Sequence, residues 1–299
     1  MADISAVPHS AQGAIGTLDV LPPRLRRAFE HTAQFDPLPP AGPSDWLAQH
    51  SEPGQTFEQF IRAPHLRPDA KRHTLYLIPL GDFPPGRSPR LDLLHAFTGA
   101  FFAMEVKLQP ALDLHPAAIA GRRNPQTGLF QLDAREILRE LRRRLPEDAF
   151  ALLGITLVDL YPDPAWNFVF GLASPGNRVG VFSFARYHPA FYGENASAGM
   201  EALVLQRSCR VLAHEIGHMF GLGHCVFFRC VMNGSNHLAE SDARPLHLCP
   251  VDLRKLQHSV GFDPEAGYRR LLDFSRKVGF DEESAWLKKR LRHLAGIPN

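Results

Sequence analysis

HEIGHMFGLGH, residues 214–224, is the stretch that decides the fold and the chemistry of this chain. It closes a run, residues 198–220, in which apolar side chains recur at helical spacing without an internal proline. On a helix, His214 and His218 lie one turn apart on the same face, so both rings can bind one ion. Glu215 follows the first histidine and is placed to hold a water molecule and take its proton.

The third histidine of the pattern HExxHxxGxxH, His224, can join the other two only if the chain turns sharply after the helix. Gly221 permits the positive φ that such a turn requires. Three neutral imidazoles leave zinc one open position for water, whose pKa zinc lowers to about 7. The sequence therefore predicts a catalytic zinc on these histidines. The competing interpretation, chance surface histidines in a chain with 15 of them, leaves the spacing unexplained.

The chain before this stretch alternates between strand and helix patterns. The predicted elements are a strand at 73–80, a helix at 90–104, a strand at 104–108, a helix at 133–145 capped by Asp133, one long strand at 150–161, and strands at 167–174 and 178–187 around the turn PGN. We therefore expect an α/β fold, or α+β if the later strands pair antiparallel. An irregular stretch, 222–248, follows the histidines, and helices are predicted at 250–256, 264–278 and 281–294.

Residues 1–54 are rich in proline and small polar residues, which predicts an extended, partly disordered arm before a hydrolase domain at 55–299. The formal net charge is only +2, which argues against nucleic acid as a partner. No apolar run approaches the length of about 20 residues needed to cross a membrane, and the N-terminus has no signal-peptide pattern. We expect a cytoplasmic protein with no membrane partner.

At HEIGHMFGLGHCVFFRCVM, residues 214–232, the sequence resembles the archaemetzincins, a branch of the metzincin zinc peptidases. Cys225, Cys230 and Met232 stand where that family has two cysteines and a methionine, and the segments 44–60, 150–171 and 233–262 are also similar. The resemblance implies a two-lobed catalytic domain with a twisted mixed sheet and an active-site helix, the upper lobe at about 55–223 and the lower at about 224–299.

The resemblance also implies roles for residues outside the histidine motif. Met232 should lie beneath the histidines as a Met-turn, although a buried methionine is otherwise most simply core filler. The last strand before the zinc helix, 178–186, should be the edge along which an extended peptide binds. Cys209, five residues before His214, is interpreted as an inert buried thiol.

A second, structural zinc is predicted on Cys225, Cys230 and Cys249, because clustered cysteines in a reducing compartment favour metal over disulfides. The family usually ends this set with CxxC, but here Asp252 stands at the fourth position. A carboxylate oxygen can bind zinc, so Asp252 is one candidate ligand. His247 or His258 could complete the set instead, the site could stay unoccupied, or Asp252 could serve only the helix that follows Cys249.

The leading hypothesis is a zinc-dependent peptidase acting on a peptide or protein substrate, with Glu215 as general base and then general acid. One alternative is a catalytically weak, zinc-containing protein that binds or scaffolds peptides. A weaker one is a zinc hydrolase of non-peptide bonds. Glu215 favours catalysis over mere binding, because holding zinc requires the histidines and not the glutamate.

Overall fold

The structure is a computed structural model that describes residues 10–30, 32–86, 88–113, 119–193, 195 and 199–297. The chain forms two compact units: Leu66–Met219, here called the sheet unit, and Met1–His65 with Phe220–Asn299, here called the helical unit. We predicted a boundary between two lobes near residue 223. The contacts between residues place the boundary after Met219 instead, and they assign the first 65 residues to the same unit as residues 220–299. Residues 1–9 of the predicted arm and the predicted helix start at Ala198 lie outside the described residues.

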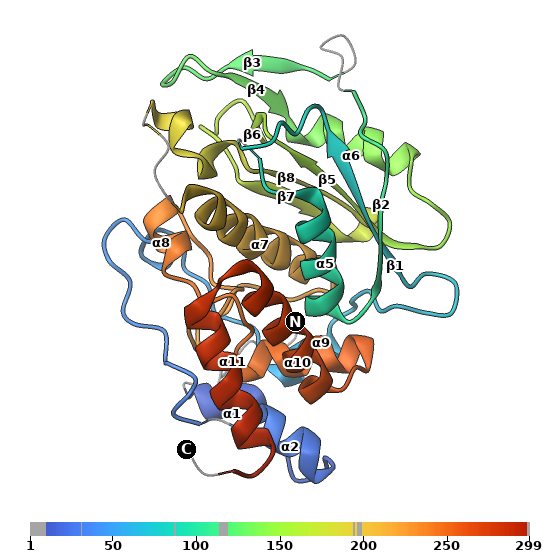
Figure 1. Cartoon of the computed structure of the whole chain (residues 1–299), viewed down its shortest axis with the longest axis vertical. Coiled ribbons are helices and arrows are strands. Elements are labelled where there is room, and N and C mark those ends of the chain that lie inside the picture. Colours follow the sequence, from blue (N-terminus) through green and yellow to red (C-terminus); the bar gives the residue numbers. More distant parts are fainter. Residues whose placement is uncertain are drawn as a thin grey trace, which may run out of the picture. The chain divides into compact units, whose positions relative to one another are not determined.

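The sheet unit is built on a five-stranded sheet with the order β2-β1-β5-β8-β7 (Figure 1). Neighbouring strands are parallel except β7, which is antiparallel to β8, so the sheet is mixed, as the α/β expectation allowed. The strands are β1 (Thr74–Leu80), β2 (Glu105–Leu108), β5 (Ala149–Thr156), β7 (Gly171–Ser174) and β8 (Val179–Ser183).

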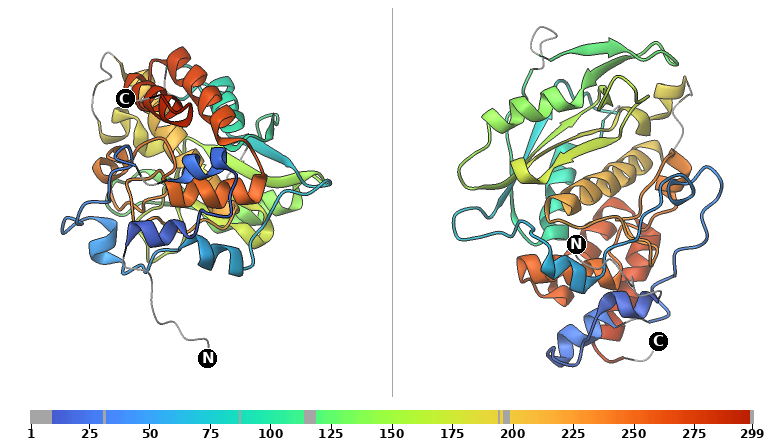
Figure 2. Two further views of the ribbon diagram at one scale, coloured as in Figure 1. Left: turned by 90° about the horizontal axis from the view of Figure 1, so that it is seen from below. Right: turned by 180° about the vertical axis from the view of Figure 1, so that it is seen from behind.

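Helices cover both faces of this sheet. Helices α5 (Leu91–Phe102) and α7 (Met200–Met219) lie against one face and α6 (Ala134–Arg143) lies against the other (Figures 1 and 2). The predicted cap of α6 is confirmed, because the Asp133 side chain accepts hydrogen bonds from the backbone N–H groups of Arg135 and Glu136. A buried core forms on the α6 side and includes Ile78, Leu80, Ile137, Leu141, Leu152 and Val181.

The long apolar run at 150–161 is two strands rather than the one we predicted. Strand β5 ends at Thr156, and β6 (Asp159–Tyr161) joins a second, three-stranded sheet with β3 (Gly121–Arg123) and β4 (Phe130–Asp133). The Thr156 hydroxyl donates to the Leu80 carbonyl at 3.0 Å and accepts from the Val158 N–H at 3.2 Å. These bonds hold a bend at the end of β5, and apolar composition alone does not mark such a bend.

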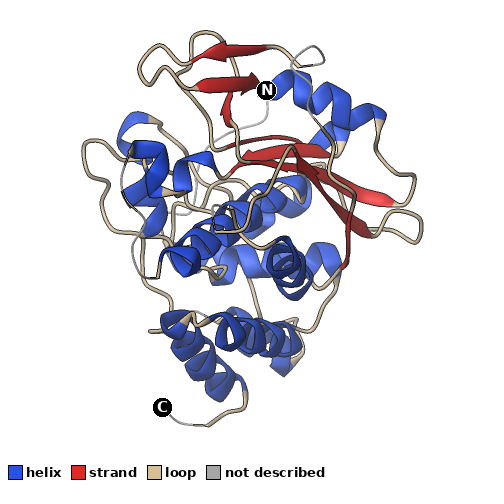
Figure 3. Cartoon of the chain, turned by 45° about the horizontal axis from the view of Figure 1, so that its top comes forward, coloured by secondary structure: helices blue, strands red, loops and turns tan. Residues whose placement is uncertain are grey.

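Over its described residues, the helical unit has helices joined by irregular segments, and the named strands all belong to the sheet unit (Figure 3). Its helices are α1 (Ala11–Ile15), α2 (Pro23–Phe29), α3 (Trp46–Gln49), α4 (Phe57–Arg62), α8 (Leu238–Asp242), α9 (Pro250–Val260), α10 (Pro264–Val278) and α11 (Asp281–Leu294). Helices α1, α2 and α4 pack on α9, and α2 also contacts α10 and α11 (Figure 2).

The described part of the predicted arm, expected to be extended, contains three short helices and is packed in part. Ile15, Phe29 and Phe35 are buried, and two arginines from the other end of the chain fix its backbone. Arg254 donates to backbone carbonyls at the end of α1 and just beyond it, and Arg290, fully buried, donates to two carbonyls at the end of α2. Proline in this segment starts a helix, at the first position of α2, instead of preventing one.

Among the described helices of both units, none combines the length and the apolar composition that a membrane span needs.

Candidate active site

Helix α7 carries the first two histidines of the motif. The Nε2 atoms of His214 and His218 are 3.0 Å apart, and the two rings are nearly perpendicular, at 88°. The pair lies one helical turn apart on the same face, as the spacing predicts. Two ring nitrogens directed at one small volume suit a single metal ion.

The turn that brings the third histidine back is present. Helix α7 ends at Met219, and Gly221 has φ +83°, as predicted for this position. A Cβ atom at Gly221 would also lie 2.8 Å from the Cβ of His65, so a side chain is excluded by space as well as by conformation. The structure brings the predicted residues together: one ligand atom from each of His214, His218 and His224 lies within 4.8 Å of the others.

Glu215 is 9% exposed and lies against the start of strand β7. A Cβ atom at Gly171 would lie 2.8 Å from both the Cδ and the Oε1 of Glu215, so only glycine leaves room for the carboxylate there. Sequence reasoning missed Gly171. The available signal was a glycine inside the strand pattern at 167–174, which marks a close approach of another group.

The strand beside Glu215 is also the free edge of the five-stranded sheet. Strand β7 is last in the strand order, whereas β8 pairs with β5 on one side and with β7 on the other. The prediction that 178–186 forms the edge is therefore wrong. Strand β7, from the pattern at 167–174, comes before β8 in the sequence. The short turn at 175–177 reverses the chain between them, so that β7 is the outer strand and β8 the inner one.

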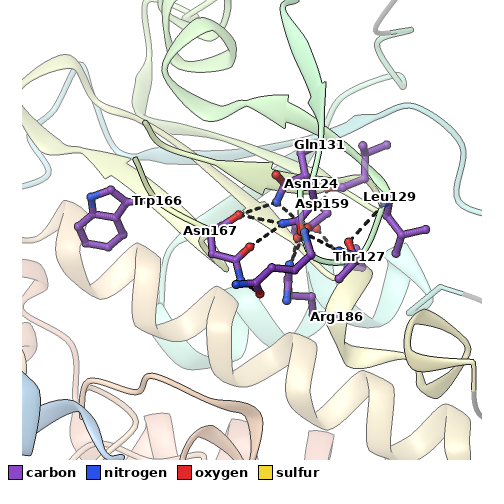
Figure 4. A network of polar contacts seen from close by, with 12 residues as sticks. Asn124, Thr127, Leu129, Gln131, Asp159, Trp166, Asn167 and Arg186 are labelled. Carbon is purple, nitrogen blue, oxygen red and sulfur yellow. Dashed lines mark hydrogen bonds and ion pairs between the residues drawn. The ribbon is translucent and has the colours of Figure 1, made fainter. Parts of the chain in front are cut away.

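A network of polar side chains fixes the segment that leads into β7, residues 163–170 (Figure 4). At its centre, the buried carboxylate of Asp159 accepts two hydrogen bonds from Arg186 and one from Gln131, each 2.8 Å long. Arg122 donates to backbone carbonyls of the segment at 2.9 and 3.0 Å. The buried bonds to Asp159 and the more exposed bonds of Arg122 are charge-assisted, and Gln131 joins the two through the Asn167 carbonyl, so together they hold the backbone as it enters the edge strand.

The cysteine cluster, defined as Cys225, Cys230, Cys249 and Asp252, is entirely buried, and its ligand atoms lie within 4.8 Å of one another. The Sγ atoms of Cys225 and Cys249 are 3.6 Å apart, and the Cys230 thiol lies 3.3 Å from Asp252 Oδ2. Asp252 also lies in the first turn of α9, where its N–H donates to the sulfur of Cys249, the N-cap residue. It is therefore both part of the helix start and a member of the cluster.

The two histidines that could have completed the cluster have other contacts. His247 stacks on Trp286 with ring centroids 3.5 Å apart, and its Nδ1 lies 2.9 Å from the carboxylate of Glu283. His258 packs edge-on against Phe57. Asp252 is thus the residue that the structure places at the fourth position.

The electrostatics of the cluster suit a cation with anionic ligands. Burial raises the pKa of Asp252 to about 6, although the Lys255 ammonium lies 2.8 Å away. Burial also raises the pKa of the Cys230 and Cys249 thiols. Burial acts on the Cys225 thiol in the same direction, but hydrogen bonds from Cys230 and Cys249 outweigh it, and the pKa of Cys225 lies well below its ordinary value. Three thiolates and a carboxylate exceed the charge of Zn²⁺, and Lys255, 1% exposed, supplies a compensating charge.

Two further predicted residues are fully buried. Cys209 is fully buried, and burial raises the pKa of its thiol well above the ordinary value, which fits an inert cysteine. Met232 is also fully buried, and its carbonyl accepts a hydrogen bond from the N–H of Cys225 at 3.0 Å.

A mixed α/β sheet next to a helix with HExxH, a glycine turn and a third histidine defines a zinc metallopeptidase of the metzincin type. Archaemetzincin-2 of Macaca fascicularis is 38% identical to this chain over 289 residues, covering 87% of this chain and 79% of its own length. Archaemetzincin-2 of Homo sapiens is 37% identical with the same coverage. The chain belongs to the archaemetzincin family.

Further comparisons found similarity over parts of the chain. Peptidase family M54 matches residues 123–258, which include both ligand sets. Archaemetzincin-1 of Homo sapiens is 34% identical over 261 residues, covering 78% of this chain and 52% of its own length. Among solved structures, archaemetzincin from Methanopyrus kandleri is 30% identical with a TM-score of 0.49, covering 64% of this chain and 97% of that one.

Proposed function

We propose that this chain hydrolyses peptide bonds, with zinc held by His214, His218 and His224 and with Glu215 as general base and then general acid. The convergence of three imidazole nitrogens within 4.8 Å, on and just after the helix that carries Glu215, supports the proposal most directly. Zinc bound there would polarise the scissile carbonyl and lower the pKa of water to about 7. Glu215 takes the proton of the attacking water and passes it to the departing amine.

The free edge of β7 is the proposed binding surface for the substrate backbone. An extended peptide can pair with an exposed strand through main-chain hydrogen bonds, and the network around Asp159 fixes the segment before this strand. Since Gly171 at the start of β7 touches Glu215, a peptide paired along this edge passes the catalytic carboxylate. The substrate class is therefore an extended peptide or an extended segment of a protein.

A second zinc on the cysteine cluster is proposed as structural. All four residues of the cluster are buried, so no open position faces solvent, which is typical of structural rather than catalytic zinc sites. We also propose a cytoplasmic location, because all four cysteines are free thiols and three of them form this ligand set. Cell fractionation followed by immunoblotting tests the location, and recovery in a secreted fraction would contradict it.

The experiment for the main proposal compares wild-type protein with Glu215→Gln on a peptide library, with zinc measured on both. Glu201→Gln, on an exposed position of the same helix, is the matched control. We expect Glu215→Gln to keep its zinc and to lose a factor of about 10² to 10⁴ in hydrolysis, because glutamine keeps the shape but cannot act as a base.

Two outcomes would overturn the proposal. Equal turnover by wild-type protein and Glu215→Gln would assign the cleavage to another site or to a contaminant. If neither protein cleaved any peptide while both held zinc and bound the same peptides, the protein would be a zinc-containing peptide binder.

A further inference from the structure

The third histidine of the motif has a carboxylate partner that the motif does not contain. Nδ1 of His224 lies 2.9 and 3.0 Å from the two carboxylate oxygens of Glu52. Both side chains are largely buried, with 18% and 27% of their surface exposed. A carboxylate can only accept here, so Nδ1 of His224 carries the proton and donates it, and Nε2 is then the ring nitrogen whose lone pair can bind a metal.

The segment that carries Glu52 is tied down on both sides of this residue. Before it, the N–H of Trp46 donates to Oε1 of Glu240 at 2.9 Å, and the Trp46 ring meets the His224 ring edge-on, with centroids 5.1 Å apart. After it, the Gln55 side chain accepts from the N–H of Gly223 at 3.1 Å and donates to the carbonyl of Gly221 at 3.2 Å. Residues 46–55 thus contact both the turn at 221–223 and the ring of His224.

Asp45, His237 and Glu240 form the anchor of this segment and resemble a metal site in composition alone. The N–H of Glu240 donates to Nδ1 of His237 at 3.2 Å, so the proton of this ring is on Nε2, which lies 3.1 Å from Oδ1 of Asp45. The two carboxylate oxygens of Glu240 accept from the N–H groups of Trp46 and Asn236, at 2.9 and 2.7 Å. These groups already bond to one another and to the backbone, which makes the set a clamp between residues 45–46 and 236–240.

We propose that Glu52 is a positioning residue for the third metal ligand. Its carboxylate selects the His224 tautomer with the proton on Nδ1 and fixes the rotation of the ring, and the clamp and Gln55 hold the carboxylate in place. The inference rests on the proposed role of His224 as a zinc ligand. A histidine oriented by a carboxylate is also a more basic ligand, and a negative charge behind it offsets that of a divalent ion held by three neutral rings.

The test measures zinc affinity at the three-histidine site by chelator competition on the full-length protein, with zinc kept on the cysteine cluster. Glu52→Ala should bind zinc about 10- to 100-fold more weakly than wild-type protein, the usual effect of removing such a partner. Glu52→Gln should lose less, because its amide oxygen can still accept from Nδ1. Glu58→Gln, an exposed glutamate six residues further on, is the matched control and should bind like the wild type.

Cobalt(II) provides a readout that a purely structural role of Glu52 would not change. Its visible absorption at the three-histidine site reports ligand geometry, so Glu52→Ala should alter the spectrum and Glu52→Gln should restore most of it. If Glu52→Ala fails to fold, Glu52→Asp decides, because it keeps the charge but withdraws the carboxylate and should still weaken zinc by at least about threefold.

Zinc affinity within twofold of wild type in Glu52→Ala, or in Glu52→Asp if the alanine variant does not fold, would overturn the inference. His224→Ala in the same assay separates this failure from failure of the proposed function. If His224→Ala also kept its zinc, the ligand assignment itself would be wrong. If His224→Ala lost zinc while the Glu52 variants kept it, only the positioning role would fall.

Discussion

The two ligand sets of this chain differ in how they meet solvent. In the three-histidine site, His214 is buried while His218 and His224 keep part of their surface exposed; the cysteine cluster is buried at every position. A partly open set of three neutral ligands leaves room for water and substrate, whereas a closed set of four ligands leaves none. If both sets bind zinc as we propose, one chain uses the same metal for chemistry and for structure, and burial separates the two uses.

The two sets also differ in what holds their ligands. His214 and His218 are fixed by the hydrogen bonds of a 20-residue helix. Cys225 and Cys230 lie in an irregular segment without helix or strand, and only the start of α9 supplies regular structure to the cluster. We therefore expect metal at the cysteine cluster to stabilise the fold far more than metal at the histidines.

The largest expected effect follows from this difference. Cys230→Ser should remove one zinc and lower the free energy of unfolding of the helical unit by about 4 kcal/mol or more, because metal binding there is part of the folding free energy. His218→Ala is the matched variant, and it should remove the other zinc with a much smaller loss of stability. Metal analysis measures the zinc content of both variants, and denaturant unfolding measures their stability. Equal destabilisation by the two variants would contradict the expectation that the cysteine cluster stabilises the fold more than the histidine site.

Acidification should act on the three-histidine site next. Ligand histidines must be neutral, so protons compete with zinc for all three rings, and zinc affinity should fall by up to about a thousandfold per pH unit as the pH is lowered. Chelator competition between pH 5 and 8 checks this. His218→Ala, which keeps only the cysteine cluster, reports how that cluster responds over the same range. Unchanged affinity and activity at pH 5 would require ligands other than histidines.

The fourth position of the cysteine cluster can be tested by exchange in both directions. Asp252→Ala should weaken zinc there by about 10- to 100-fold, because it removes a ligand and leaves the buried Lys255 ammonium without its carboxylate. Asp252→Cys should keep the zinc, since it completes a four-cysteine set at unchanged spacing. Zinc loss in both variants would mean that the carboxylate is needed for Lys255 rather than for the metal.

The last prediction concerns the contact between β7 and Glu215. Gly171→Ala should lower kcat by about 10- to 100-fold with zinc content unchanged, because its Cβ would displace the carboxylate by a fraction of an ångström or more. Gly176→Ala, where an added Cβ meets no atom within 4 Å, is the control. Wild-type kcat in Gly171→Ala would show that Glu215 tolerates displacement.

The features that could be predicted from the sequence are local ones. The spacing of His214 and His218, the turn at Gly221 and the cap at Asp133 each depend on residues only a few positions apart, so helical geometry is enough to derive them. The order of β7 and β8 in the sheet is not local. It depends on which partners the strands find, and the predicted edge was therefore assigned to the wrong strand.

The features that could not be predicted depend on distant partners. Helices α1 and α2 have 5 and 7 residues, too short to be stable alone, and their contacts with α9, α10 and α11 come from the far end of the chain. Glu52 lies in the family-like segment 44–60 but outside the histidine motif, and the sequence does not show that it contacts His224, a residue 172 positions away. The choice of Asp252 over His247 likewise depends on Trp286, which holds the histidine elsewhere.

The helical unit is assembled from both ends of the chain, with the whole sheet unit inserted between them. During synthesis, residues 10–65 are made before α9, the helix on which α1, α2 and α4 pack. The surroundings of His224 include Trp46 and Glu52 from this earlier segment, and α9 follows His224 in the sequence. A chain cut before α9 would therefore lack the helix that holds the early segment, and with it the finished surroundings of the third histidine.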